Sequence, residues 1–347
     1  MDVRLSPEQR ALRDSAVQVV DRLGPHAVGE LDDPERVAKL DAAVAASGWR
    51  ELRTATDGGA PWASGVEVAL VAEELGRGLA DVPYLGPTLA AELRRLAGAP
   101  PAASPETVAL APDRSALACR PDGTTAAGCV AVDARGAVSA LLLVPAAGGH
   151  TLAQVALPDG AGRVDLTRTT VALDPSVAVV PLADRGEVVT AEAEARWTAL
   201  GLALTSADLV GAMRGAVRLA VDYAKQRRQY GAPIGSFQAV QHLLADAFVA
   251  AEGSASATLH AAWAVDALPA GDALAAAAVA KAYSARAART VCETAIQVHG
   301  GIGNTWDCLA HLYLRRGLLS GDVLGGTGAN LARVLDHHRI GDARGFR

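Results

Sequence analysis

The stretch that decides the fold lies in the C-terminal third of the chain, where residues 223–238 read YAKQRRQYGAPIGSFQ. An apolar stripe at helical spacing leads into it, and we expect that helix to end at Gly231, where the chain can turn. Arg227 supplies a permanently charged, forked donor that suits a pyrophosphate. Gln238 can hydrogen-bond adenosine or phosphate groups. The alternative for Arg227 is a solvated helix end.

A second stretch, QVHGGIGNTW at residues 297–306, follows a long Ala-rich region with helical periodicity. Gly300 and Gly301 allow a ligand to approach the backbone closely, and their amides can donate to phosphate oxygens. Gln297 offers the same hydrogen bonds as Gln238. We also expect the glycine pair to end the preceding helix, which does not exclude a ligand role.

Outward from these stretches, composition divides the chain into regions of different periodicity. Ser6-Pro7-Glu8-Gln9 predicts a helix start with a capping box, and residues 6–96 read as helices, with a second periodic stretch from Val66 to Leu79. From residue 97 to about 190 the chain is rich in Gly, Pro, Thr and Val. The runs in that region that we predict to be strands are Val108–Ala111, Cys129–Val132, Ala140–Val144, Val164–Leu166 and Val177–Val180.

Helical periodicity returns at about residue 192 and continues to the end of the chain. Long helices are expected over Ala239–Val265 and Gly271–Val298, and a last one over Leu331–His338. We interpret their apolar stripes as the core of a bundle. The fold class is therefore α+β, mainly α. The predicted domains are 1–98 (helical), 99–190 (a small β domain) and 191–347 (a helical bundle).

Length, charge and cysteine content narrow the possible functions. The chain has 347 residues, half of them apolar, which is enough for more than one domain. A net charge of −6 without a basic run argues against nucleic acid and anionic membranes as partners. The four cysteines have neither metal-ligand nor disulfide spacing. The first residues lack the features of a signal peptide and no run is long enough to span a membrane, so we expect a cytoplasmic protein.

In the order and content of these regions the chain resembles the acyl-CoA dehydrogenase family over essentially its whole length. The resemblance implies an N-terminal helical domain, a small central β domain and a C-terminal four-helix bundle. It also implies FAD as cofactor, an acyl-CoA thioester as substrate for α,β-dehydrogenation, and electron-transfer flavoprotein as electron acceptor. In the family, residues that match the two stretches cross a subunit interface and hold the ADP half of the neighbouring subunit's FAD.

By that resemblance the cofactor-binding role falls to Arg227, Gln229, Tyr230, Phe237, Gln238, Gln297, Val298, His299, Gly300, Gly301 and Thr327. For Tyr230 and Phe237, a purely structural place in the subunit interface is the alternative. No metal site is expected.

The β domain departs from the family pattern. The family's Gly-Ser-Asp segment is absent, and between Tyr84 and Trp197 there is no Phe, Tyr or Trp. The usual aromatic wall for an isoalloxazine ring is therefore missing. Asp165-Leu-Thr-Arg168 resembles a family segment of this domain, but we interpret it as a strand with a structural arginine.

The position of the catalytic base is also vacant. Where the family has Tyr-Glu-Gly-Thr, this chain has Leu-Gly-Gly-Thr, which places Gly325 at the base position. The alternative base position, on the first helix of the bundle, falls at Gly201. Glycine has nothing to titrate, so no catalytic residue is assigned. The nearest acids are Asp208, expected at a helix start, and Asp322, expected in a loop.

Because it has the cofactor motif but no base, the chain resembles the short subunit of α2β2 acyl-CoA dehydrogenases. Each such heterotetramer holds two FAD. The resemblance implies a non-catalytic chain that supports a longer catalytic partner subunit, in fatty acid or steroid side-chain catabolism. Two alternatives stay open. One is a homotetrameric flavoenzyme with a relocated base, and the other is a flavin-free scaffold.

Overall fold

The computed structural model describes residues 4–31, 33–120, 128–158, 165–174, 176–182 and 188–340. Its N-terminal part is helical, and its first helix begins with the predicted capping box. The Ser6 side chain accepts from the Gln9 amide, and the Gln9 side chain accepts from the Ser6 amide. The helices are α1 (Pro7–Leu23), α2 (Pro34–Ala46), α3 (Gly65–Arg77) and α4 (Leu85–Leu96), with the short 3-10 turns η1 (Val28–Glu30) and η2 (Trp49–Glu51).

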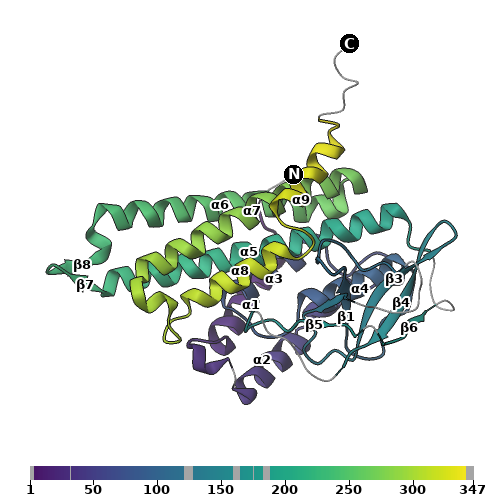
Figure 1. Cartoon of the computed structure of the whole chain (residues 1–347), viewed down its shortest axis with the longest axis horizontal. Coiled ribbons are helices and arrows are strands. Elements are labelled where there is room, and N and C mark those ends of the chain that lie inside the picture. Colours follow the sequence, from purple (N-terminus) through teal and green to yellow (C-terminus); the bar gives the residue numbers. More distant parts are fainter. Residues whose placement is uncertain are drawn as a thin grey trace, which may run out of the picture.

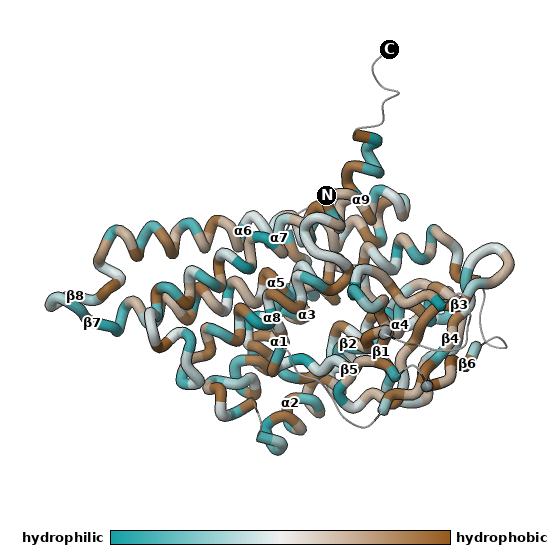
Figure 2. Tube along the Cα trace, in the orientation of Figure 1, coloured by the Kyte–Doolittle hydropathy of each residue, from teal (hydrophilic) through white to brown (hydrophobic). Residues whose placement is uncertain are grey.

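A six-stranded sheet follows, in the order β5-β2-β1-β3-β4-β6. The neighbouring strands β1 and β3 run parallel, and the other neighbouring pairs are antiparallel. The strands are β1 (Glu106–Leu110), β2 (Val130–Val132), β3 (Ser139–Ala146), β4 (Gly149–Ala156), β5 (Val171–Ala172) and β6 (Val179–Pro181). Figure 2 shows hydrophobic residues concentrated along these strands.

Two strand predictions need correction. The predicted strand over Val164–Leu166 is wrong, because Asp165 and Leu166 lie in a turn, while Val164 lies outside the described residues. In that turn Asp165 accepts hydrogen bonds from the amide and hydroxyl of Thr167, which favours the bend over extended chain. The strands β4 and β5 were not predicted, and β4 forms a long hairpin with β3.

The C-terminal half of the chain is a bundle around one long helix. The helices are α5 (Ala191–Gln226), α6 (Gln238–Ala267), α7 (Ala270–His299), α8 (Ala310–Asp322) and α9 (Thr327–His337), with the 3-10 turns η3 (Ile234–Ser236) and η4 (Gly300–Asn304). In the described chain only α5 is long and apolar enough to cross a membrane, yet 89% of its apolar window is buried inside the protein. It is therefore a core helix.

One end of α5 lies beside the sheet, and its other end carries a small hairpin at the opposite tip of the molecule (Figure 1). The helix ends at Gln226, with Arg227 as its C-cap, and not at Gly231 as predicted. Tyr230 and Gly231 both have positive φ, 52° and 80°, and they join the strands β7 (Arg228–Gln229) and β8 (Ala232–Pro233). A two-residue turn of this kind suits a tight hairpin.

Candidate functional site

The two sequence stretches meet at the tip of the bundle that carries this hairpin. Tyr223, near the end of α5, stacks on His299, the last residue of α7, with ring centroids 4.5 Å apart. This contact brings the hairpin and the glycine pair to the same end of the molecule. The chain's own sheet lies at the other end (Figure 1).

Most of the predicted cofactor residues are exposed at this tip. Tyr230 is 95% exposed and Phe237 is 37% exposed, and their rings meet edge to face at 6.3 Å. Arg227, Gln229, Gln238, Gln297, Gly300 and Gly301 are also exposed. These side chains and backbone groups are free to meet a ligand that lies outside the chain.

Three of the predicted residues are placed differently. Val298 and His299 are buried, and His299 donates through Nδ1 to the Ala295 carbonyl at 2.7 Å. Thr327 begins α9, away from the hairpin, and its hydroxyl lies 3.3 Å from the Ala282 carbonyl. The structure therefore does not bring Thr327 together with the other predicted residues.

The backbone of the glycine pair is open on its outer side. Gly300 has φ 65°, and a Cβ placed on Gly300 or Gly301 would meet no atom within 4 Å. The Gly300 amide already donates to the Ile296 and Gln297 carbonyls, so it caps α7. Arg227, which is exposed at the same tip, and the accessible backbone of Gly301 are therefore the groups whose chemistry suits phosphate oxygens.

The two positions where the family carries its base have different surroundings. A Cβ on Gly201 would lie 2.3 Å from Leu324 Cδ1 and 3.5 Å from Leu89 Cδ2, and both leucines are fully buried. A carboxylate at Gly201 would have to displace this apolar packing. A Cβ on Gly325 would lie 3.0 Å from the Cβ of Ala329, 3.4 Å from Arg333 Nη1 and 3.6 Å from Asn330 Nδ2, and Gly325 has φ 89°, which L side chains rarely adopt.

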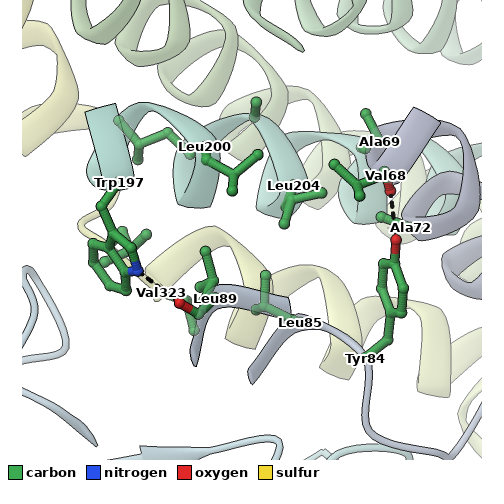
Figure 3. Packing of buried hydrophobic residues seen from close by; sticks show 14 of the residues in the cluster. Val68, Ala69, Ala72, Tyr84, Leu85, Leu89, Trp197, Leu200, Leu204 and Val323 are labelled. Carbon is green, nitrogen blue, oxygen red and sulfur yellow. Dashed lines mark hydrogen bonds between the residues drawn. The ribbon is translucent and has the colours of Figure 1, made fainter. Parts of the chain in front are cut away.

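Figure 3 shows the same region from close by, with Leu200 and Leu204 of α5 facing Leu85 and Leu89 of α4. Trp197 is fully buried, and its Nε1 donates to the Leu89 carbonyl at 2.9 Å. At the other end of the cluster, the Tyr84 hydroxyl donates to the Val68 carbonyl at 3.0 Å. The interior between α4 and α5 is therefore a closed hydrophobic core.

Asp208 is not a helix-start residue, as the sequence had suggested, but lies in the middle of α5 and is 1% exposed. Its carboxylate accepts from Arg316 at 2.7 and 3.0 Å and from the Ser320 hydroxyl at 2.6 Å. Arg168 also lies 2.9 Å away, which confirms that Arg168 has a structural role. Burial would raise the pKa of Asp208, but the charges of Arg168 and Arg316 outweigh it and lower the pKa to about 2.

Asp208 is therefore a fully paired anion that cannot serve as a general base near neutral pH. Its partners could not be found from sequence spacing, because they come from the turn just before β5 and from α8. Asp322 is the last residue of α8 and not a loop residue, and it pairs with Arg114 while more than half exposed. Neither acid is placed to take part in chemistry inside the chain.

Comparisons with known proteins agree with this geometry. Residues 198–336 match the family described as acyl-CoA dehydrogenase, C-terminal domain. The acyl-CoA dehydrogenase IpdE2 of Mycobacterium tuberculosis is 33% identical over 269 residues, which cover 74% of this chain and 73% of that protein. The acyl-CoA dehydrogenase FadE34 of the same organism is 38% identical over 214 residues, which cover 62% of this chain but 30% of FadE34.

Two solved structures share the fold over nearly the whole chain. The Tcur3481-Tcur3483 steroid ACAD G363A variant superposes with a TM-score of 0.80 at 24% identity, covering 97% of this chain and 99% of that one. The ChsE4-ChsE5 complex from Mycobacterium tuberculosis gives 0.78 at 24% identity, with coverage of 98% and 99%. The motif at the bundle tip, the order of the elements and these similarities lead to one conclusion: the chain belongs to the acyl-CoA dehydrogenase family of FAD-dependent oxidoreductases.

Proposed function

We propose that this chain is the non-catalytic, FAD-supporting subunit of a heteromeric acyl-CoA dehydrogenase. The complex would convert an acyl-CoA thioester to its 2,3-enoyl-CoA. The observation that carries the proposal is the separation of two features within one chain. The cofactor motif is exposed at one tip of the molecule, whereas both positions of the base are glycines, and the one on α5, Gly201, is closed off by Leu89 and Leu324.

The catalytic carboxylate would then belong to a longer partner subunit, which also supplies the pocket for the isoalloxazine ring. That partner would remove the α proton of the thioester. FAD, when bound, supplies the acceptor for the β hydride. Electron-transfer flavoprotein is the proposed electron acceptor, and the cytoplasm is the proposed compartment.

The residues of this chain would act only on the ADP half of the cofactor. The Arg227 guanidinium would neutralise the diphosphate through a charged, forked pair of hydrogen bonds. The Gly301 amide would donate to a phosphate oxygen, and the side chains of Gln238 and Gln297 would hydrogen-bond phosphate or adenosine groups. Tyr230 and Phe237, both exposed at the tip, would cover this part of the cofactor from water.

The names of the similar proteins support a heteromeric assembly and a bulky acyl group. One structural neighbour is a complex of two differently named chains, and the other is a pair of chains described as a steroid ACAD. We therefore propose an α2β2 assembly that acts on a steroid-derived acyl-CoA.

The test is reconstitution of acyl-CoA dehydrogenation with an artificial electron acceptor. The purified chain alone should be inactive and nearly colourless, and a longer dehydrogenase chain from the same source should restore yellow colour and turnover when co-expressed. A matched control replaces Gly325 in this chain by Glu, and we expect no additional active site, because no flavin ring lies beside it. Turnover by the purified chain alone would overturn the proposal.

A further inference from the structure

A cavity of about 440 Å³ lies against the outer face of α4. Pro87, Ala91 and Arg94 line it, and at helical spacing they fall on the face opposite Leu85 and Leu89, which face α5 (Figure 3). Its other walls come from η2, from the segment that joins α4 to β1 and from the turn between β2 and β3. Small-molecule sites enclose about 300–1,000 Å³, so the cavity is large enough to hold a ligand.

A second cavity, of about 400 Å³, adjoins the first beside α2. The two have Asp41, Pro83, Arg135 and Gly136 in common, so together they form one cleft. Most of the remaining lining residues are apolar, among them Leu31, Val37, Ala91, Pro101, Ala102 and Ala137. The cleft therefore suits an elongated ligand with an apolar body.

The arginines of the cleft are held in fixed positions. Arg50 donates through Nε to the Pro83 carbonyl at 2.8 Å, and its Nη2 pairs with Asp41. Arg94 donates through Nη2 to Glu106 at 2.8 Å, and both of these side chains are buried. The carboxylates of Asp41 and Glu106 are thus already engaged, and the guanidinium groups are oriented before any ligand arrives.

Arg50 keeps donors that these contacts do not use. A guanidinium carries five N–H groups and no acceptor. Within the described part of the chain, Arg50 donates only through Nε and Nη2, so Nη1 is left for a ligand. In the lining of the first cavity arginines also outnumber acidic residues by four to three. The polar group of the ligand should therefore be an acceptor, and a carboxylate matches the forked geometry of a guanidinium.

We propose that this cleft binds an apolar monocarboxylic acid. The carboxylate accepts hydrogen bonds from Arg50, and the apolar body lies along the walls that Ala91 and Ala137 contribute. The cleft is separate from the tip of the bundle and from the closed core between α4 and α5. The proposal therefore does not rest on the proposed function, and its test uses the full chain on its own.

The test is isothermal titration calorimetry with decanoate, and decan-1-ol serves as the neutral probe of the same chain length. Decanoate should bind about tenfold or more tightly than decan-1-ol, because a hydrogen bond to a charged group contributes more than one between neutral groups. Absence of decanoate binding, or equal affinity for the two probes, would overturn the proposal.

Arg50→Gln tests the polar end of the site. It removes the charge and the fork, so it should abolish the preference for decanoate and leave the affinity for decan-1-ol unchanged. A folded Arg50→Gln variant that still prefers decanoate by the same factor would contradict the role of Arg50. If this variant does not fold, the substitutions of the apolar wall decide.

Ala91→Leu tests the apolar wall. It should weaken decanoate binding by about tenfold or more, because the larger side chain occupies the cavity. Ala45→Leu is the matched control, since Ala45 is exposed on α2 and lines neither cavity, and it should leave the affinity unchanged. Undiminished binding to folded Ala91→Leu would place the ligand elsewhere and refute the site. If Ala91→Leu does not fold, Ala137→Leu, in the turn between β2 and β3, is judged by the same criterion.

Discussion

At the scale of single residues, the most consequential group is Asp208, which holds two arginines at the centre of the molecule. Arg316 and Ser320 reach it from α8, and Arg168 reaches it from the turn just before β5. All of these side chains are buried, so each charge depends on the others for compensation.

Asp208→Asn should therefore lower the free energy of unfolding, without a direct effect on the chemical step of the reaction. Two buried guanidinium groups would lose their shared anion, which costs about 3–5 kcal/mol of unfolding free energy when one partner of a buried pair is removed. Chemical denaturation measures this loss. Asp322→Asn is the control, because its pair with Arg114 is largely exposed and contributes about 1 kcal/mol or less.

A loss of turnover without a loss of stability would show that Asp208 is a catalytic base after all. If folded Asp208→Asn kept its stability and its FAD, yet the complex lost about a hundredfold or more in turnover, Asp208 would have to act as a general base. A homomeric enzyme would then be the better interpretation.

Arg227→Ala should weaken FAD retention by the complex. A charged hydrogen-bond pair to phosphate is worth about 1.5–3 kcal/mol, so affinity should fall by about tenfold or more. Arg227→Lys should restore only part of it, because the forked geometry is lost. Fluorescence titration of released flavin measures the affinity.

The neighbouring Arg228 is the matched control for this prediction. It is exposed on the same hairpin, and its Nη2 donates to the Gly231 carbonyl at 2.8 Å. Arg228→Ala should change FAD affinity much less than Arg227→Ala. Equal affinity in the parent and in Arg227→Ala would place the cofactor contact elsewhere.

At the scale of elements, α3 and α5 approach so closely that glycine is required between them. A Cβ on Gly211 would lie 1.9 Å from the Glu73 carbonyl oxygen, and a Cβ on Gly215 would lie 2.4 Å from the Arg77 carbonyl oxygen. Both obstacles are backbone atoms, so the helices themselves would have to separate.

Gly211→Ala should therefore lower the free energy of unfolding by about 1–3 kcal/mol, the usual cost of overpacking. Gly321→Ala on α8 is the control, because its Cβ would meet the Cβ of Ala285 at an ordinary 3.7 Å. That variant should be neutral or gain up to about 1 kcal/mol from helix propensity. Equal thermal stability of the two variants would contradict the close approach of α3 and α5.

The contact between α7 and α8 contains a buried lysine that makes stability depend on pH. Lys281 is fully buried and donates to the Ser320 carbonyl, and burial lowers its pKa from 10.5 to about 7. Between these two values the unfolded chain binds more protons at this position than the folded protein. The contribution of Lys281 to the free energy of unfolding therefore rises with pH across that window.

Lys281→Met should remove this rise, which denaturant titrations at several pH values would measure as a difference from the parent protein. Lys225→Met is the control, since Lys225 is exposed and should leave the pH dependence unchanged. The account of Lys281 fails if the parent protein and Lys281→Met show the same slope between pH 7 and 10.

At the scale of the whole molecule, local patterns predicted most helices and strands, because capping boxes and apolar periodicity act within a few residues, but they did not predict α8. The Arg227 stretch and the glycine pair could likewise be recognised from their local sequence, and the structure places both at the tip of the bundle. The hairpin at Tyr230 and Gly231 was missed, because Tyr-Gly is not among the residue pairs that typically form a two-residue hairpin turn. The role of Asp208 could not be predicted, because Arg168 and Arg316 reach it only through the tertiary fold.

The proposed cofactor contacts lie at the tip of α5, and the vacant base position at Gly201 lies near its other end, so we propose that a longer partner chain completes the active site. Native mass spectrometry of the complex with its longer partner tests this most directly, because it counts subunits and FAD together. The account predicts two copies of each chain and two FAD. A tetramer of this chain alone with four FAD would contradict it.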